Sequence, residues 1–331
     1  MRLQEYNSIE DKEKVFGEKY KYILTAKDFE DWYKKLQSGS VYRGLNNASY
    51  KNYTSLQRLY LTHDYGAKMD PWKFVEKEIE YLKVANNHFL ERFLNSTNME
   101  VTDFSYLSYL QHYKDGATPL LDFTKDINTA LFFMCDGSTF PQCGDGDINN
   151  FCSHPVSSFA SVYYLHKTEY YDSERFLNDI GGILKGTIIQ LCENISHNED
   201  LKTINKMDVD EGTKTQINLN MSLKYMKEVI RKDVPLLLED KVLPINCIKS
   251  KTNFVIANPN LVAQKGCFLF NSDEYIPFEN GLSCVDIHKS LIPYIQKKYL
   301  NDKYTRNTMF PNMDDIVSKV VTDSLADIYA E

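Results

Sequence analysis

The order of helical and extended patterns along the chain constrains its fold more than any other feature. Helical spacing of apolar residues comes first, over 26–37, 71–94 and 101–116. Short apolar runs typical of strands dominate later, over 161–167, 186–192, 253–259 and 261–270, with further helices expected over 220–233, 288–300 and 312–329. Helices ahead of the strands and between them predict an α+β fold with a central mixed or antiparallel sheet.

The chain shows neither an internal repeat nor a linker, so a single domain is expected. We place an N-terminal extension at 1–24, the domain at 25–325 and a short C-terminal tail at 326–331. Within the domain, residues 136–158 are rich in Gly, Asp, Asn, Ser and Cys, which predicts a loop excursion from the core.

Composition and charge narrow the class of protein. Apolar residues make up 43% and charged residues 25% of the chain, as in ordinary globular proteins. The net charge of -8 argues against generic nucleic-acid binding, which relies on a positive surface. No apolar run is long enough for a membrane span and the N-terminal residues are acidic, so a cytoplasmic protein that does not engage a membrane is expected.

No metal ion is expected. Cys135, Cys143, Cys152 and His154 lie close together in sequence but lack the C-x2-C spacing of tetrahedral zinc sites. The DGDIN run at 145–149 lacks the bidentate Glu that ends a calcium loop.

One polar and aromatic segment, residues 109–134, contains a helix end, a turn, a strand and a helix start in succession. The run LLDF at 120–123 is short and apolar, so we expect a buried strand there. Thr124 is expected to cap the helix that follows. His112, Asp122 and Thr124 therefore project from the ends of elements, where sites are commonly built.

Arg43 is expected on a short strand over 41–44. Its guanidinium could bind a phosphate or carboxylate, with Gly44 allowing the ligand close to the backbone, or it could form a buried ion pair with Asp122. Asp122 stands between apolar residues, where a carboxylate needs a partner. The alternatives for Asp122 are a structural salt bridge or hydrogen bonds to backbone amides, and an acid/base role.

The remaining candidates also have two interpretations each. His112 could contact a ligand or take part in catalysis, or serve as a structural histidine near a helix end. Gln264, on the strand expected over 261–270, could bind a ligand or tie two strands together. Tyr42 and Phe133 could stack on a base or belong to the core, and Arg58 could clamp phosphate or lie on a solvated helix face.

Six ordered motifs resemble the FRG domain family, which is named for a Phe-Arg-Gly motif and is often associated with bacterial defence. They are YRG at 42–44, QHY at 111–113, TPLLDFT at 118–124, ALFF at 130–133, AQKGCF at 263–268 and MFPNMDDI at 309–316. The resemblance covers about residues 25–325. The chain departs from the family at Pro119 and Asn260, where a basic residue is common.

The chain also resembles, more loosely, the Arg-Ser-Glu ADP-ribosyltransferases. This resemblance implies an ADP-ribosyltransferase-like core in which Arg43 holds the phosphates of NAD and Thr124 shapes the nicotinamide ribose site. Gln264 stands where those enzymes carry a Glu. A neutral amide does not supply the negative charge that an oxocarbenium-like centre requires, so the pattern supports a nucleotide pocket more directly than catalysis.

Together the resemblances imply an effector of a bacterial anti-phage defence or toxin system that binds NAD or another nucleotide. The activity would be that of an ADP-ribosyltransferase or an NAD glycohydrolase. The reacting centre would include His112, Asp122 and Gln264, and the cofactor would contact Tyr42, Arg43, Gly44, Arg58, Thr124 and Phe133. The alternative is a non-catalytic binding or sensor module that acts through a protein partner.

Overall fold

The computed structural model describes residues 3–63, 69–96, 103–111, 116–138, 155–169, 171–172, 236–238, 259–271 and 273–312. These residues contain an eight-stranded sheet of strand order β1-β8-β4-β2-β3-β7-β6-β5. Its strands are β1 (Tyr20–Ile23), β2 (Val41–Leu45), β3 (Leu120–Thr124), β4 (Phe159–Leu165), β5 (Tyr171–Asp172), β6 (Leu236–Leu238), β7 (Gly266–Phe270) and β8 (Ser283–His288). The β1–β8 and β5–β6 pairs are parallel and the other described pairs antiparallel, so the predicted α+β class with a mixed sheet is confirmed.

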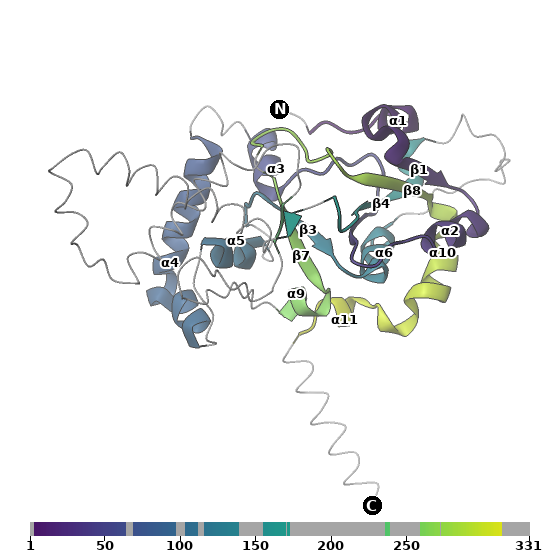
Figure 1. Ribbon diagram of the computed structural model, residues 1–331. Helices are drawn as coiled ribbons and strands as arrows, with labels where there is room; N and C mark the ends of the chain where they lie inside the picture. The colour runs from purple at the N-terminus through teal and green to yellow at the C-terminus, as the bar shows by residue number, and fades with distance from the viewer. Residues whose placement is uncertain are drawn as a thin grey trace, which may run out of the picture.

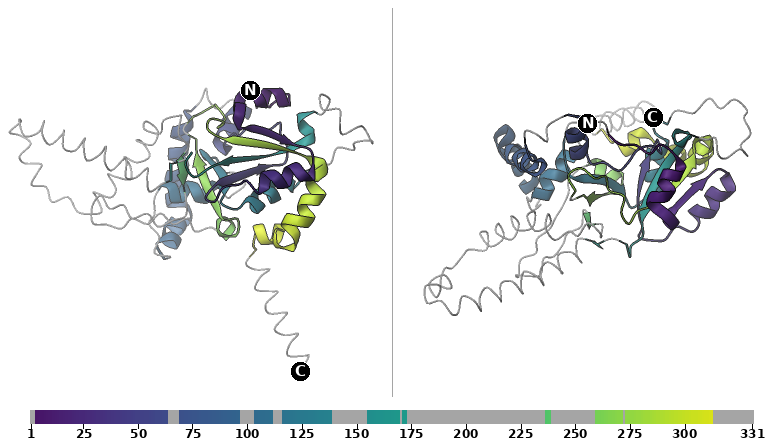
Figure 2. Two further views of the ribbon diagram at one scale, coloured as in Figure 1. Left: turned by 45° about the vertical axis from the view of Figure 1, so that its right-hand side comes forward. Right: turned by 90° about the horizontal axis from the view of Figure 1, so that it is seen from above.

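Helices surround this sheet (Figure 1). The α-helices are α1 (Ile9–Phe16), α2 (Ala26–Tyr33), α3 (Ser55–Thr62), α4 (Pro71–Ser96), α5 (Asp103–Gln111), α6 (Ile127–Cys135), α9 (Pro259–Ala263), α10 (Ile292–Ile295) and α11 (Arg306–Met309). Figure 2 shows α3, α4 and α5 gathered at one end of the sheet, while α2, α6 and α10 pack toward the other end. Strand β3 contacts both α5 and α6 and so lies at the boundary between the two helical groups.

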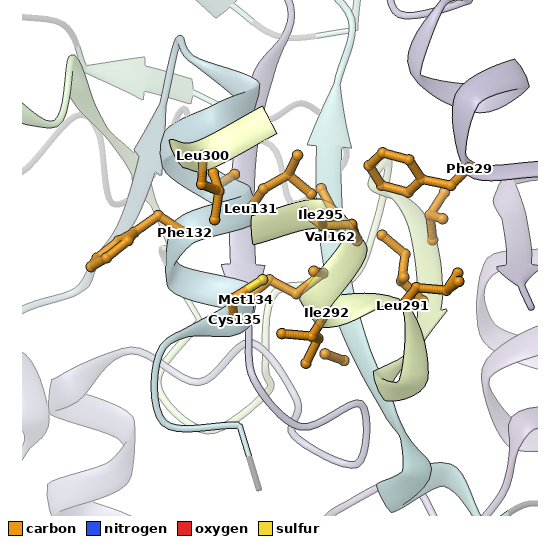
Figure 3. Packing of buried hydrophobic residues seen from close by; sticks show 14 of the residues in the cluster. Phe29, Leu131, Phe132, Met134, Cys135, Val162, Leu291, Ile292, Ile295 and Leu300 are labelled. Carbon is orange, nitrogen blue, oxygen red and sulfur yellow. The ribbon is translucent and has the colours of Figure 1, made fainter. Parts of the chain in front are cut away.

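The core on the α6 face of the sheet combines helices from distant parts of the sequence. Leu131 and Met134 of α6 pack against Ile292 and Ile295 of α10, with Val162 of β4 behind them (Figure 3). All five side chains are almost fully removed from water. Burial of such apolar side chains stabilises the fold by about 1.5–3 kcal/mol each, which fixes α6 on the sheet.

The first predicted helix is confirmed. The Thr25 side chain accepts a hydrogen bond from the Asp28 backbone N–H at 3.1 Å and so caps α2. Phe29 and Trp32 are buried on its inner face, as their spacing predicts. The helix ends at Tyr33, before the end of the predicted range.

The prediction for the second half of α4 is wrong. The helical spacing over 71–94 predicts Phe89 and Phe93 on the core face, yet both are exposed, at 50% and 40%. Backbone angles at 85–88 are not helical, and positive φ values at 86–88 interrupt the turn. The break changes the phase of the helix, so Leu90 is buried in place of the two phenylalanines.

The segment 261–270 is a short helix and a strand, and not the single strand predicted. Pro259–Ala263 form α9, and β7 begins only at Gly266. Lys265, between them, has a φ of +46°. Gln264 therefore lies in a turn, and its expected position on a late strand is wrong.

The cap of α6 also differs from the prediction. Asp126 is the N-cap, because its side chain accepts a hydrogen bond from the Asn128 backbone N–H at 3.1 Å. Thr124, three residues before the helix begins, instead accepts a hydrogen bond from the Asp126 backbone N–H at 3.0 Å. Its hydroxyl thus shapes the turn that leads into α6.

Residues 1–24, expected to be an extension, contribute α1 and β1 to the packed structure. Lys12 of α1 is fully buried and pairs with Asp286 of β8, with 2.7 Å between Nζ and Oδ1. Lys12 also donates to the Ser161 hydroxyl and the Ala48 carbonyl. Tyr20 of β1 donates to the other carboxylate oxygen of Asp286 at 2.7 Å. Because every charge in this network has a partner, α1 is anchored to the sheet.

Several predicted elements lie outside the described residues, namely the strands at 186–192 and 253–258 and the helices at 220–233 and 313–329. Most of the predicted loop at 136–158 does as well. The predicted helix at 288–300 is confirmed as a run of 3-10, α and π turns. Among the described helices, none is both long enough and apolar enough to cross a membrane.

Candidate functional site

The strands β2 and β3 pair at one position only and then separate. Tyr42 lies opposite Thr124, and no further pair follows in the register of these two strands. On its other side, β2 pairs with β4 along its whole length. The separation leaves the carbonyl of Asp122 without a β2 backbone partner and allows a side chain to reach it.

Arg43 reaches into this opening. Its Nη1 donates to the Asp122 carbonyl at 2.8 Å and lies 3.9 Å from the Asp122 carboxylate. Its Nε is buried and finds no hydrogen-bond partner among the residues that the structure describes. Arginine binds carboxylates and phosphates in a bidentate manner through the edge formed by Nε and Nη2. In Arg43 this edge makes no hydrogen bond within the described part of the chain.

The charge of Arg43 is incompletely compensated. Its side chain is only 11% exposed, and burial lowers its pKa to about 10. Asp122 opposes that change, whereas the nearby positive charge of Arg58 adds to it. A guanidinium with this pKa remains protonated at neutral pH, so the fold holds a positive charge in a poorly hydrated position.

Asp122 is accessible to solvent, in contrast to the strand residues on either side of it. Its side chain is 50% exposed, and Oδ2 accepts a hydrogen bond from Gln111 Nε2 at 2.8 Å. Gln111 is held in turn by the Thr118 hydroxyl and by the Ser55 hydroxyl. The carboxylate is thus positioned from α5 while one side of it faces water.

Arg58 brings a second guanidinium to the same region. The residue as a whole is exposed on α3, yet desolvation of its guanidinium lowers its pKa, while the charge of Asp122 raises it. Within the described residues, the Arg58 guanidinium forms neither an ion pair nor a hydrogen bond. Counting only the described residues, two arginines and one aspartate share this region, so their charges sum to one positive charge.

Thr124 and Gln264 form a separate group at the other end of β3. The Thr124 hydroxyl donates to the Gln264 carbonyl at 2.7 Å. The Gln264 side chain is 8% exposed and donates from Nε2 to the Met309 carbonyl at 2.9 Å. These contacts join the turn before β7 to β3 and to α11, so both side chains have structural roles.

The two aromatic candidates and Gly44 pack in the core. Tyr42 is 4% exposed within the cluster around α6, and Phe133 packs edge-on against Phe310 with 6.0 Å between ring centroids. A Cβ on Gly44 would lie 1.9 Å from the Ala130 carbonyl oxygen. The glycine therefore allows α6 to approach β2, which explains its presence without a ligand.

The other predicted features contribute no described site. His112 lies outside the described residues, as do Cys143, Cys152 and His154. No group of three or more His, Cys, Asp or Glu side chains in the described ranges could hold a metal ion. An open depression near the N-terminus, lined by Gln4, Glu5, Tyr6, Asn7, Asp11, Lys14, Val15 and Lys51, includes none of the predicted residues.

Residues 38–141 match the model of the FRG domain family. The chain contains an FRG domain. The match includes Arg43, Arg58, Gln111 and Asp122, whereas Gln264 lies beyond its end. Searches of curated proteins and of solved structures found no match to the chain.

Two contributors to this site are absent from the set of candidates chosen from the sequence. Gln111 belongs to the QHY motif, and its amide holds the Asp122 carboxylate. Thr118 fixes the Gln111 carbonyl oxygen. Their occurrence within the two motifs QHY and TPLLDFT is the only signal in the sequence that could have indicated them.

Proposed function

We propose that the FRG domain of this protein binds the phosphate groups of NAD or a similar nucleotide through Arg43 and Arg58. The observation that carries this proposal is the unused edge of Arg43. A buried guanidinium normally has partners for its donors, because an unpaired buried charge is costly. Among the described residues, Nη1 has a partner, whereas Nε is buried without one.

The charges around Arg43 favour an anionic ligand. Asp122 is the carboxylate that acts on both arginines, and it lies 3.9 Å from Arg43 Nη1, beyond hydrogen-bond distance. A phosphate could accept two hydrogen bonds from the free edge of Arg43 and interact with Arg58 as well. It would also compensate the excess positive charge and so raise the pKa of Arg43 toward its ordinary value.

The resemblance to ADP-ribosyltransferases extends the proposal to a reaction on NAD. In that reaction the positive charge that develops at the ribose carbon needs a carboxylate nearby. Gln264 cannot supply it, and its amide is bonded to the Met309 carbonyl. Asp122 is the described acidic side chain that acts on both arginines, so we assign it the role of charge stabilisation if the domain is an ADP-ribosyltransferase or NAD glycohydrolase of a defence or toxin system.

A non-catalytic binding or sensor module is the second candidate. The position of Gln264 favours this candidate. Gln264 stands where ADP-ribosyltransferases carry a Glu, but here it lies in a turn, and its amide is hydrogen-bonded to the Met309 carbonyl. In this case ligand binding at Arg43 would be transmitted to a protein partner and no bond would be broken.

Isothermal titration calorimetry with NAD, ADP-ribose and ATP tests the proposal. The wild-type chain should bind at least one of them, and Arg43→Gln should reduce the affinity at least tenfold, while Arg92→Gln on the exposed side of α4 should bind normally. Nicotinamide release from NAD separates the two candidates. If none of the three ligands binds to the wild-type chain, the proposal is wrong.

A further inference from the structure

The Asp122 carboxylate is unusual for a phosphate site, because it places a negative charge beside the arginines that would bind the anion. It is half exposed and close to Nη1 of Arg43, and it acts on Arg58 as well. A bare polyanion placed on the two arginines would be repelled by it. A ligand that also carries a hydroxyl group could instead donate a hydrogen bond to the carboxylate.

The carboxylate cannot easily turn away from the arginines. Its Oδ2 is held by Gln111 Nε2 at 2.8 Å. Gln111 is itself fixed by Thr118, and the peptide of Asp122 is fixed by Arg43. Three residues therefore keep a negative charge at the edge of a positively charged site.

We propose that Asp122 is a specificity-determining residue that selects phosphate esters carrying a hydroxyl group, such as sugar phosphates, over bare polyanions. This inference rests on the proposed binding of phosphate by Arg43 and Arg58. The phosphate is bound by the two arginines, and the hydroxyl group donates to the exposed side of the Asp122 carboxylate. Inorganic pyrophosphate is excluded, because it carries the negative charge that the carboxylate repels and has no carbon-bound hydroxyl group to donate to the carboxylate.

The variant Asp122→Asn tests this inference because it removes the charge and keeps the shape. The Asn oxygen can still accept the hydrogen bond from Gln111, so the local structure is retained. Asp31→Asn, on the exposed side of α2, makes the same change in net charge away from the site and serves as the control.

Binding of ribose 5-phosphate and of pyrophosphate is measured by isothermal titration calorimetry at fixed ionic strength and pH. The wild-type chain and Asp31→Asn should prefer ribose 5-phosphate. Asp122→Asn should bind pyrophosphate at least tenfold more tightly than the wild type does, and ribose 5-phosphate more weakly.

The outcomes separate the two proposals. If both ligands bind through Arg43 and Asp122→Asn changes their affinities by the same factor, Asp122 does not select and the inference is overturned while the proposed function stands. If neither ligand binds to the wild type or to Asp122→Asn, the phosphate site itself is refuted and the inference falls with it.

Discussion

Replacement of Arg43 by Met separates a ligand-binding arginine from a structural one. The lowering of the Arg43 pKa to about 10 corresponds to about 3 kcal/mol against the charged form. The hydrogen bond from Nη1 to the Asp122 carbonyl opposes this by about 1.5–3 kcal/mol. Methionine fills much of the same volume without a charge. The free energy of unfolding of Arg43→Met should therefore stay within about 1 kcal/mol of the wild type or rise above it.

Urea denaturation followed by circular dichroism measures this change, with Arg92→Met as the exposed control. Asp122 retains the Gln111 hydrogen bond and contact with water in the variant, so its carboxylate is not left buried and unpaired. A loss of about 3–5 kcal/mol, as expected on breaking a buried structural ion pair, would refute the reasoning. Arg43 would then be a structural residue.

Three further predictions concern the scaffold and are checked by the same denaturation assay. Lys12→Met leaves the Asp286 carboxylate buried without its cation and should cost about 3–5 kcal/mol. Gly44→Ala places a Cβ against the α6 backbone and should lower the free energy of unfolding by about 3 kcal/mol or more. The control Gly17→Ala adds a Cβ that meets no atom within 4 Å, so it should cost about 1 kcal/mol, because φ is positive at this position. Burial raises the pKa of Glu78 from 4.5 to about 7, so the folded protein holds this proton more tightly than the unfolded chain does. Because this carboxyl is partly exposed, solvent screening reduces the effect, and stability should fall by about 1–2 kcal/mol as pH rises from 4.5 to 7. Glu78→Gln should remove this dependence.

Local signals in the sequence were sufficient to predict several elements correctly. The cap at Thr25 and the apolar spacing of α2 both depend on neighbouring residues in the chain, and so does the apolar run of β3. The α+β class follows from the order of such elements. These predictions succeed because each depends on backbone geometry over a few residues.

The errors occur where distant contacts decide the structure. The apolar face of α4 is interrupted by residues 86–88, which have positive φ values. The spacing of apolar residues in the sequence does not indicate this break. β1 and β8 were not predicted, because their residues pair only with segments more than a hundred positions away. The run 261–270 predicts a strand because apolar residues lie on both sides of Gln264 and Lys265, although the chain turns before Gly266.

The candidate site was predicted in part. An ion pair between Arg43 and Asp122 is one of the two interpretations that the sequence leaves open, and the structure brings these residues together with Arg58. The resemblance to ADP-ribosyltransferases places Thr124 and Gln264 in one site. In the structure, hydrogen bonds from these two side chains join the turn before β7 to β3 and to α11. The free edge of Arg43 could not be predicted, because it depends on the separation of β2 from β3 after a single pair.

The binding of ADP-ribose to the wild-type chain and to Arg43→Lys tests the central claim most directly. Lysine keeps the positive charge but cannot form the two parallel hydrogen bonds of the Nε–Nη2 edge. We expect measurable binding by the wild type and at least a tenfold weaker affinity for Arg43→Lys, with unchanged thermal stability of the ligand-free protein. Equal affinity of the two proteins for ADP-ribose would contradict the account, and so would the failure of ADP-ribose, NAD and ATP alike to bind to the wild-type chain.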